Sequence, residues 1–164
     1  MNAVEARPRY RLSKSAKEKI EKEASKYPSR RAAVKSALRY CQEEAGWISK
    51  EIVNAVAEFL GITPIEVYEV ATFYDMFYTE PGGRHRIRVC TNVSCMLRGS
   101  ETIVKHLQDR LGIELGETSS DGRITLLEAE CLGACGGAPM LICGHQYFEN
   151  LTIEKLDSLL EKLD

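Results

Sequence analysis

The sequence predicts an α+β protein, with a small N-terminal helical bundle followed by a C-terminal α/β domain that has a mixed sheet. Residues 13–78 carry apolar side chains at helical spacing almost without interruption. Residues 84–164 instead alternate between strand-like and helix-like patterns. Between them, TEPGG (79–83) combines a proline with two glycines, which is typical of a boundary between domains. We therefore expect a flexible leader at 1–12, a helical domain at 13–78, a linker at 79–83 and a second domain at 84–164.

Two helices are expected in the first half of the helical domain. The run SAKEKIEKEASKY is rich in helix-forming residues and ends just before Pro28. A second helix is expected to stop at Gly46, a residue type common just beyond helix ends. Its inner face is predicted from apolar residues at helical spacing, which are Val34, Ala37, Leu38, Cys41 and Ala45.

Two more helices complete this domain. Ser49 is expected to cap the third helix, which ends at Gly61. The tetrapeptide Thr63-Pro64-Ile65-Glu66 combines a capping box with a proline at the first helical position, so it predicts the start of a fourth helix. We expect that helix to continue through IEVYEVATFYDMF, as far as Phe77.

The second domain has the element order strand, helix, strand, hairpin, helix. In the first strand Ile87 and Val89 fall on one face, as in a strand buried on one side. The tight turn Gly144-His145 predicts the hairpin. The expected elements are a strand at 84–90, a helix at 101–112, a strand at 123–131, hairpin strands in PMLIC and QYFEN, and a helix capped by Thr152.

Composition excludes several classes of protein. The chain has 22 Lys and Arg against 24 Asp and Glu, so its formal net charge of −2 does not suggest nucleic-acid binding. No run approaches the roughly 18 apolar residues of a membrane helix, so no membrane insertion is expected. The N-terminus has no apolar core of a secretory signal. We therefore expect a cytoplasmic location, where paired cysteines indicate metal or redox chemistry more often than disulfides.

Four of the six cysteines form two close pairs. Cys90 and Cys95 have C-x4-C spacing, and Cys131 and Cys135 have C-x3-C spacing. We expect Cys90 and Cys131 to close the two strands, Cys95 to lie in a loop and Cys135 to lie in a glycine-rich loop. Pro139 would then start the next strand. Four thiolates that converge on one point suit a [2Fe–2S] cluster or a tetrahedral zinc ion.

Spacing and surroundings rank the possible centres. The cysteine patterns of plant-type and bacterial two-cluster ferredoxins do not occur, and no histidine pair suggests a Rieske centre. The segment CLGACGGAP offers free backbone N–H groups that can stabilise cluster sulfurs. The residues alone rank an iron–sulfur cluster first and zinc second. A dithiol oxidoreductase ranks third, because neither cysteine pair has the C-x-x-C spacing of such enzymes.

Three segments together resemble a known family. YEVATFYDMF (68–77), RVCTNVSC (88–95) and AECLGACGGAP (129–139) are similar to the small thioredoxin-like [2Fe–2S] subunit of respiratory complex I, the E-subunit family of NADH-quinone oxidoreductase. Related subunits occur in NAD-linked hydrogenases and formate dehydrogenases. The similarity runs from about residue 15 to the end of the chain.

This resemblance implies a thioredoxin-like C-terminal domain and an electron-transfer role without catalysis by this chain alone. It implies one [2Fe–2S] cluster held by Cys90, Cys95, Cys131 and Cys135. It also implies a flavoprotein partner that binds NADH and FMN, other subunits of the complex I peripheral arm, and a place on the cytoplasmic face of the inner membrane. The absence of G-x-G-x-x-G and P-loop motifs agrees with nucleotide binding on a partner.

Two rival functions remain open from the sequence. The first is a zinc-stabilised module for protein interaction, and the second is a ferredoxin that diffuses freely between enzymes. Cys41 and Cys143 are expected to be small core residues. The aromatic residues of the helical domain are expected to lie mostly in its core, although the apolar tract TFYDMFY also suits an interface.

Overall fold

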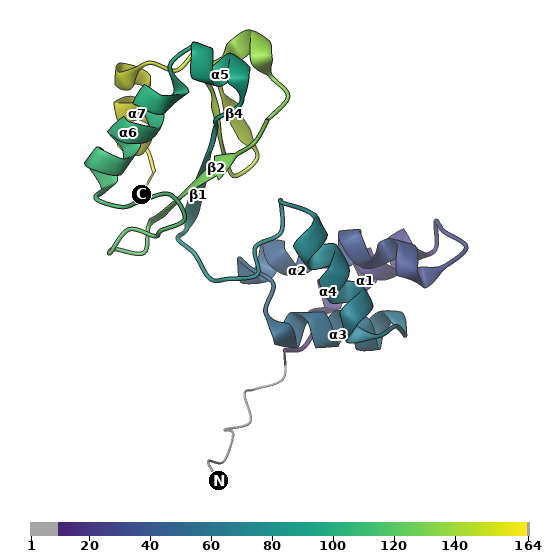
Figure 1. The fold of residues 1–164 in the computed structure, drawn as a ribbon. Helices are drawn as coiled ribbons and strands as arrows, with labels where there is room; N and C mark the ends of the chain where they lie inside the picture. The colour runs from purple at the N-terminus through teal and green to yellow at the C-terminus, as the bar shows by residue number, and fades with distance from the viewer. Residues whose placement is uncertain (1–9, 164) are drawn as a thin grey trace. The chain divides into compact units, whose positions relative to one another are not determined.

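A computed structural model describes residues 10–163. The contacts divide the chain into two compact units, Met1–Pro81 and Gly82–Asp164. In the described residues, the first unit has helices and no strand, and the second has a mixed sheet with helices, so the predicted fold class is confirmed (Figure 1). The predicted leader at 1–12 lies largely outside the described residues, but Leu12 is buried in the core of the first unit.

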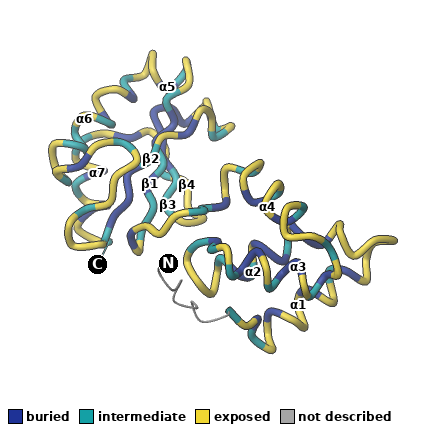
Figure 2. Tube along the Cα trace, turned by 60° about the horizontal axis from the view of Figure 1, so that its bottom comes forward, coloured by how far each residue is buried: buried dark blue, intermediate teal, exposed yellow. Residues whose placement is uncertain are grey.

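The helical unit has one shared core. Its elements are α1 (Lys14–Ala24), the short 3-10 helix η1 (Arg30–Ala33), α2 (Val34–Ala45), α3 (Lys50–Leu60) and α4 (Pro64–Phe73). Ile20, Leu38 and Val56 are fully buried at its centre. Figure 2 shows buried positions in dark blue along the helices of this unit. Cys41 is also fully buried here, which confirms its predicted packing role, whereas Ala45 is exposed and was wrongly assigned to the inner face.

The predicted cap at Ser49 and the predicted stops at Gly46 and Gly61 are confirmed, whereas α1 ends at Ala24, before the predicted end at Tyr27. The Ser49 hydroxyl accepts a hydrogen bond from the Ile52 N–H at 3.3 Å, so it caps α3. Gly46 and Gly61 end α2 and α3 with φ of +83° and +71°, a left-handed conformation that glycine adopts without a steric penalty. The Ser13 hydroxyl caps α1 by accepting from the Ala16 N–H at 2.9 Å.

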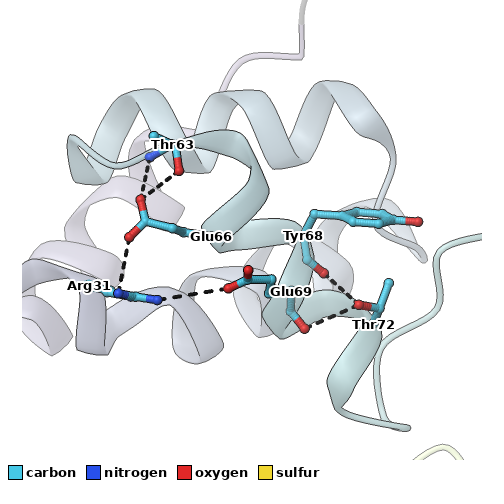
Figure 3. Close-up of polar contacts among 6 residues, drawn as sticks. All are labelled: Arg31, Thr63, Glu66, Tyr68, Glu69 and Thr72. Carbon is cyan, nitrogen blue, oxygen red and sulfur yellow. Dashed lines mark hydrogen bonds and ion pairs between the residues drawn. The ribbon is translucent and has the colours of Figure 1, made fainter.

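The start of α4 is fixed by polar contacts (Figure 3). Glu66 Oε2 accepts from the Thr63 N–H at 2.9 Å and from the Thr63 hydroxyl at 2.7 Å, and Pro64 takes the first helical position. Arg31 of η1 lies 3.3 Å from Glu66 Oε1 and 4.0 Å from Glu69 Oε2. The same glutamate therefore helps to start the helix and joins it to η1.

α4 is shorter than predicted because Gln42 of α2 competes for the backbone that follows it. The Gln42 side-chain amide donates to the Met76 carbonyl at 2.9 Å, and its oxygen accepts from the Tyr78 N–H at 2.8 Å. The chain leaves the helix after Phe73, and Phe77 is buried in the core. Phe73 is 80% exposed, which agrees with the expectation that part of the TFYDMFY tract suits an interface.

The second unit contains a four-stranded mixed sheet. Its elements are β1 (His85–Cys90), α5 (Val93–Leu97), α6 (Ser100–Leu111), β2 (Ile124–Ala129), the 3-10 helix η2 (Cys135–Gly137), β3 (Leu141–Cys143), β4 (Gln146–Phe148) and α7 (Ile153–Leu160). The strand order is β2-β1-β3-β4, with β1 and β2 parallel and the other neighbours antiparallel. The predicted hairpin is confirmed as β3 and β4.

One face of this sheet is covered by α6 and α7, which lie on the same side in Figure 1. Ile87 and Val89 of β1 contribute to this core together with Leu107 of α6 and Leu156 of α7. His106 Nε2 lies 2.9 Å from Asp157 Oδ1 and joins the two helices at the edge of the core. Among residues 10–163, no helix is both long and apolar enough to span a lipid bilayer.

Candidate metal centre

The parallel pairing of β1 and β2 brings the two cysteine pairs together. Cys90 is the last residue of β1 and is in register with Ala129, the last residue of β2. Because parallel strands run in the same direction, both segments leave the sheet at the same edge. Cys131 follows two residues later, so the prediction that it closes the strand was wrong. The last ladder hydrogen bond, from the Thr91 N–H to the Ala129 carbonyl at 3.0 Å, ends the pairing before Cys131.

Cys95 lies in the short helix α5, where the sequence analysis placed a loop. The Met96 N–H donates to the Asn92 carbonyl at 2.8 Å and closes the turn that carries Cys95. A helix of five residues is too short to show a periodic pattern, which explains the error. The turn points Cys95 inward, and this residue is 1% exposed while Cys90 is 3% exposed.

The second pair lies on a more exposed loop. Cys131 and Cys135 are both exposed, and Cys135 begins η2. Gly133 between them has a φ of +73°, and its N–H donates to Cys131 Sγ at 3.4 Å. The Tyr147 hydroxyl of β4 donates to the Leu132 carbonyl at 3.2 Å and holds the loop against the hairpin. β3 begins at Leu141, so the prediction that Pro139 starts this strand was wrong.

The thiols of the two pairs contact one another. The Cys95 and Cys131 thiols both lie close enough to the Cys90 thiol to lower its pKa. Cys95 also interacts electrostatically with Cys135. The structure therefore brings all four predicted ligand residues into one neighbourhood, drawn from the end of β1, from α5 and from the loop after β2.

Backbone N–H groups surround these sulfurs. The N–H groups of Asn92 and Leu132 lower the pKa of Cys90, and that of Met140 acts in the same direction on Cys95, so these groups face the two sulfurs. The Gly133 N–H donates to Cys131 Sγ at 3.4 Å. Sequence reasoning anticipated such donors in the glycine-rich loop but missed Asn92 and Met140. No residue type reveals them, because a backbone group donates whatever its side chain.

These contacts separate the acidities of the two buried thiols. Burial opposes ionisation of Cys90, but the N–H groups of Asn92 and Leu132 and the Cys95 and Cys131 thiols outweigh it, so the pKa of Cys90 is lowered. Burial, followed by the neighbouring Cys90, raises the pKa of Cys95 to about 11. The site thus favours one thiolate over the other, and a bound metal must displace the remaining protons.

The donor set fits a [2Fe–2S] cluster. Among residues 10–163, no group of three or more His, Cys, Asp or Glu side chains is arranged closely enough to hold a metal ion. The contacts found are those between thiols described above, and none of the six cysteines forms a disulfide in this part of the chain. Four thiols that receive several backbone N–H donors are the ligands and surroundings that a [2Fe–2S] cluster uses.

The other two cysteines lie outside this neighbourhood. Cys41 belongs to the core of the helical unit, where burial raises its pKa to about 12. Cys143 of β3 is half-buried beside the core between the sheet and its two helices, and burial raises its pKa as well. Both therefore pack as small apolar residues, as the sequence predicted for them.

The chain is similar to known [2Fe–2S] proteins. A family model described as thioredoxin-like [2Fe-2S] ferredoxin matches residues 20–164. The E 2 subunit of NADH-quinone oxidoreductase from Rhizobium meliloti (strain 1021) is 48% identical over 88% of this chain and 86% of its own length. The E subunit of NADH-quinone oxidoreductase from Pseudomonas aeruginosa is 40% identical over 93% of this chain and 92% of its own.

Two further likenesses cover less of the matched protein. The mitochondrial NADH dehydrogenase [ubiquinone] flavoprotein 2 of Dictyostelium discoideum is 43% identical over 88% of this chain and 60% of its own length. An NAD+-reducing [NiFe]-hydrogenase structure superimposes with a TM-score of 0.68 at 22% identity, over 79% of this chain and 22% of the hydrogenase chain. The hydrogenase likeness supports the fold alone.

Proposed function

The chain belongs to the thioredoxin-like [2Fe–2S] ferredoxin family, and on that premise we propose that it is the electron-transfer subunit of an NADH-quinone oxidoreductase, with one [2Fe–2S] cluster on Cys90, Cys95, Cys131 and Cys135. The observation that carries this proposal is the contact of the Cys90 thiol with Cys95 in α5 and Cys131 after β2. The chain is a subunit of an oxidoreductase complex and performs no bond-making chemistry by itself.

When bound, the cluster supplies one-electron chemistry, and the residues of this chain set its conditions. The four thiolates hold the metal, and the N–H groups of Asn92, Leu132, Gly133 and Met140 lie against the sulfurs. N–H donors favour the more negative, reduced state, so they raise the reduction potential. Burial of Cys90 and Cys95 keeps water from one side of the site, while the loop of Cys131 and Cys135 leaves the other side open.

The exposed side of α5 is suited to a partner. Val93, Met96 and Leu97, which we call the α5 patch, are 56%, 45% and 76% exposed although all three are apolar. They flank Cys95, so a partner that covers them would lie beside the proposed cluster. We propose that this partner is the flavoprotein that holds FMN and NADH. The chain has no nucleotide-binding motif of its own, so NADH and FMN would be bound by the partner.

The rest of the assembly follows from the same family. We propose that other subunits of a peripheral arm contact the helical unit, whose Ile65, Tyr68 and Phe73 are 60%, 45% and 80% exposed. The complex would then stand on the cytoplasmic face of the inner membrane. An NAD-linked hydrogenase or formate dehydrogenase is the second candidate setting.

Metal analysis of the protein purified without oxygen tests the cluster. We expect about two irons and two acid-labile sulfides per chain, with an EPR signal after reduction. Stoichiometric zinc without iron would show a zinc-stabilised module instead. Purification from the native source tests the setting, because a lone chain without a flavoprotein would indicate a free ferredoxin.

A further inference from the structure

Glu149 lies directly against the loop that carries the second cysteine pair. Its carboxylate fills the space in which Gly137 would have a side chain. An ideal Cβ built on Gly137 would overlap Glu149 Oε2 and would be 2.5 Å from Glu149 Cδ. Gly137 is the last residue of η2, which Cys135 begins. An acidic side chain is thus packed on the backbone two residues beyond a proposed ligand.

Two main-chain hydrogen bonds hold this arrangement. The Asn150 N–H donates to the Gly137 carbonyl at 2.7 Å, and the Leu151 N–H donates to the Pro139 carbonyl at 3.0 Å. The segment that begins with Glu149 is therefore clamped beside residues 137–139. Because both clamps are backbone bonds, they remain when the Glu149 side chain is changed.

The neighbouring glycine shows that the Glu149 carboxylate, and not the backbone conformation, occupies the space beside position 137. Gly137 does not have the positive φ that excludes most side chains, and neither does Gly136. A Cβ on Gly136 would meet nothing within 4 Å, whereas one on Gly137 would overlap Glu149. The carboxylate is also uncompensated, since Glu149 has no hydrogen bond or ion pair within residues 10–163, and Lys155 instead bonds the Asn150 carbonyl.

We propose that Glu149 is an electrostatic tuning residue, whose uncompensated carboxylate, seated on Gly137, lowers the reduction potential of the cluster held by the adjacent cysteines. The inference rests on the proposed ligand set. A fixed negative charge disfavours addition of one electron to a site that is already anionic. This effect opposes that of the N–H donors to the sulfurs. Because Glu149 is exposed, its effect is moderate and is screened by salt.

The test compares Glu149→Gln with the wild-type protein by EPR-monitored redox titration. The amide keeps the shape of the side chain and removes its charge. At a fixed potential, we expect the ratio of reduced to oxidised cluster to rise about two- to tenfold, where tenfold corresponds to a shift of about 59 mV for one electron. The increase should be larger near 0.01 M salt than near 1 M salt, and the EPR line shape should not change.

Two further variants separate charge from structure. Asp109→Asn makes the same change in net charge on an exposed residue in the last part of α6, roughly 14 Å along that helix from its first residue, and is expected to leave the ratio unchanged. Gly137→Ala displaces the carboxylate without neutralising it and should raise the ratio.

The outcomes are distinct. A wild-type protein without iron and sulfide would refute the ligand set itself. A wild-type cluster whose potential does not respond to Glu149→Gln, or responds equally at both salt concentrations, would overturn the tuning role. Loss of the cluster from Glu149→Gln would also overturn it, because that result shows a purely structural requirement.

Discussion

The thiol of Cys90 lies beside the thiol of Cys131, although one ends β1 and the other follows β2. The link depends on strand pairing, since Cys90 is in register with Ala129 and the chain needs only two more residues to reach Cys131. The third thiol, that of Cys95, comes from α5, the short helix that follows β1. The sheet thus acts as the rigid support that a preformed metal site requires.

Removal of any one of the four paired cysteines should abolish or alter the cluster. For Cys131→Ala, we expect iron to fall from about two per chain to near zero, because three thiolates cannot complete the usual ligand set. Iron analysis and visible absorbance provide the measurement. Cys143→Ala and Cys41→Ala serve as matched controls and should retain full iron content. Equal loss in a control variant would show that the ligand assignment is wrong.

Sequence patterns predicted the element types well where a pattern was long or a cap was present. Ser49 and Gly61 marked the ends of α3 correctly, and Thr63 with Glu66 marked the start of α4. These signals are local, since each depends on hydrogen bonds within a few residues. The same local logic failed at the end of α4, because Gln42 takes the backbone groups there from a distant helix.

The candidate site was likewise predicted only in part. Cysteine spacing and the resemblance indicated which four residues to consider. Their positions on α5 and beyond β2 depended on where strand pairing stops, which no spacing rule specifies. The contacts of the Met140 N–H and of the Glu149 carboxylate with the site could not be predicted from the sequence, because each depends on the pairing of distant segments.

The buried Cys41 thiol should make stability depend on pH in alkaline solution. Burial raises its pKa to about 12 in the folded protein, against about 8.5 in an unfolded chain. A raised pKa in the folded state gives stability that is complete below about pH 8.5 and is lost as the pH rises toward the folded value. The loss approaches about 1.4 kcal/mol per pH unit within that window.

Urea unfolding of the wild type and of Cys41→Ala between pH 7 and pH 10, under reducing conditions, measures this slope. The variant cannot titrate at position 41, so the difference between the two free energies of unfolding should change above about pH 8.5. A difference that stays constant over the whole range would contradict the prediction.

We propose that the two compact units unfold separately. Leu38 and Leu156 are fully buried, the first in the helical core and the second under the sheet. Truncation to alanine at either position should cost about 2–5 kcal/mol. Leu38→Ala should lower the melting temperature of a helical circular-dichroism transition while the cluster absorbance bleaches at an unchanged temperature. Leu156→Ala should lower the temperature at which the cluster absorbance bleaches and leave the helical transition unchanged. One shared transition that both variants shift would exclude separate unfolding.

The hydroxyl of Thr125 stabilises the start of the second unit. It accepts from the Gly83 N–H at 2.7 Å and bonds the Thr118 hydroxyl at 2.8 Å, and Thr125 is only 6% exposed. Thr125→Val keeps the shape but leaves a buried N–H without its acceptor, so we expect a loss of about 1–3 kcal/mol in chemical denaturation. Thr125→Ser retains the hydroxyl, so its free energy of unfolding should fall by less. Equal losses in the two variants would assign the effect to packing.

The α5 patch should determine binding to the flavoprotein without affecting the cluster. Leu97 is 76% exposed, so Leu97→Glu should change the stability of the isolated chain very little. In a complex that covers the patch, the same substitution would bury an unpaired charge. We expect affinity for the purified flavoprotein to fall at least about tenfold, measured by calorimetry, with iron content unchanged. Thr102→Glu places a new charge on an exposed, neutral residue of α6 and serves as the control. If Leu97→Glu bound as tightly as the wild type, the partner would have to lie on another face.

The salt dependence of binding provides a second test of the α5 patch. A loss of affinity caused by burial of a charge persists at high ionic strength, whereas repulsion between exposed charges is screened.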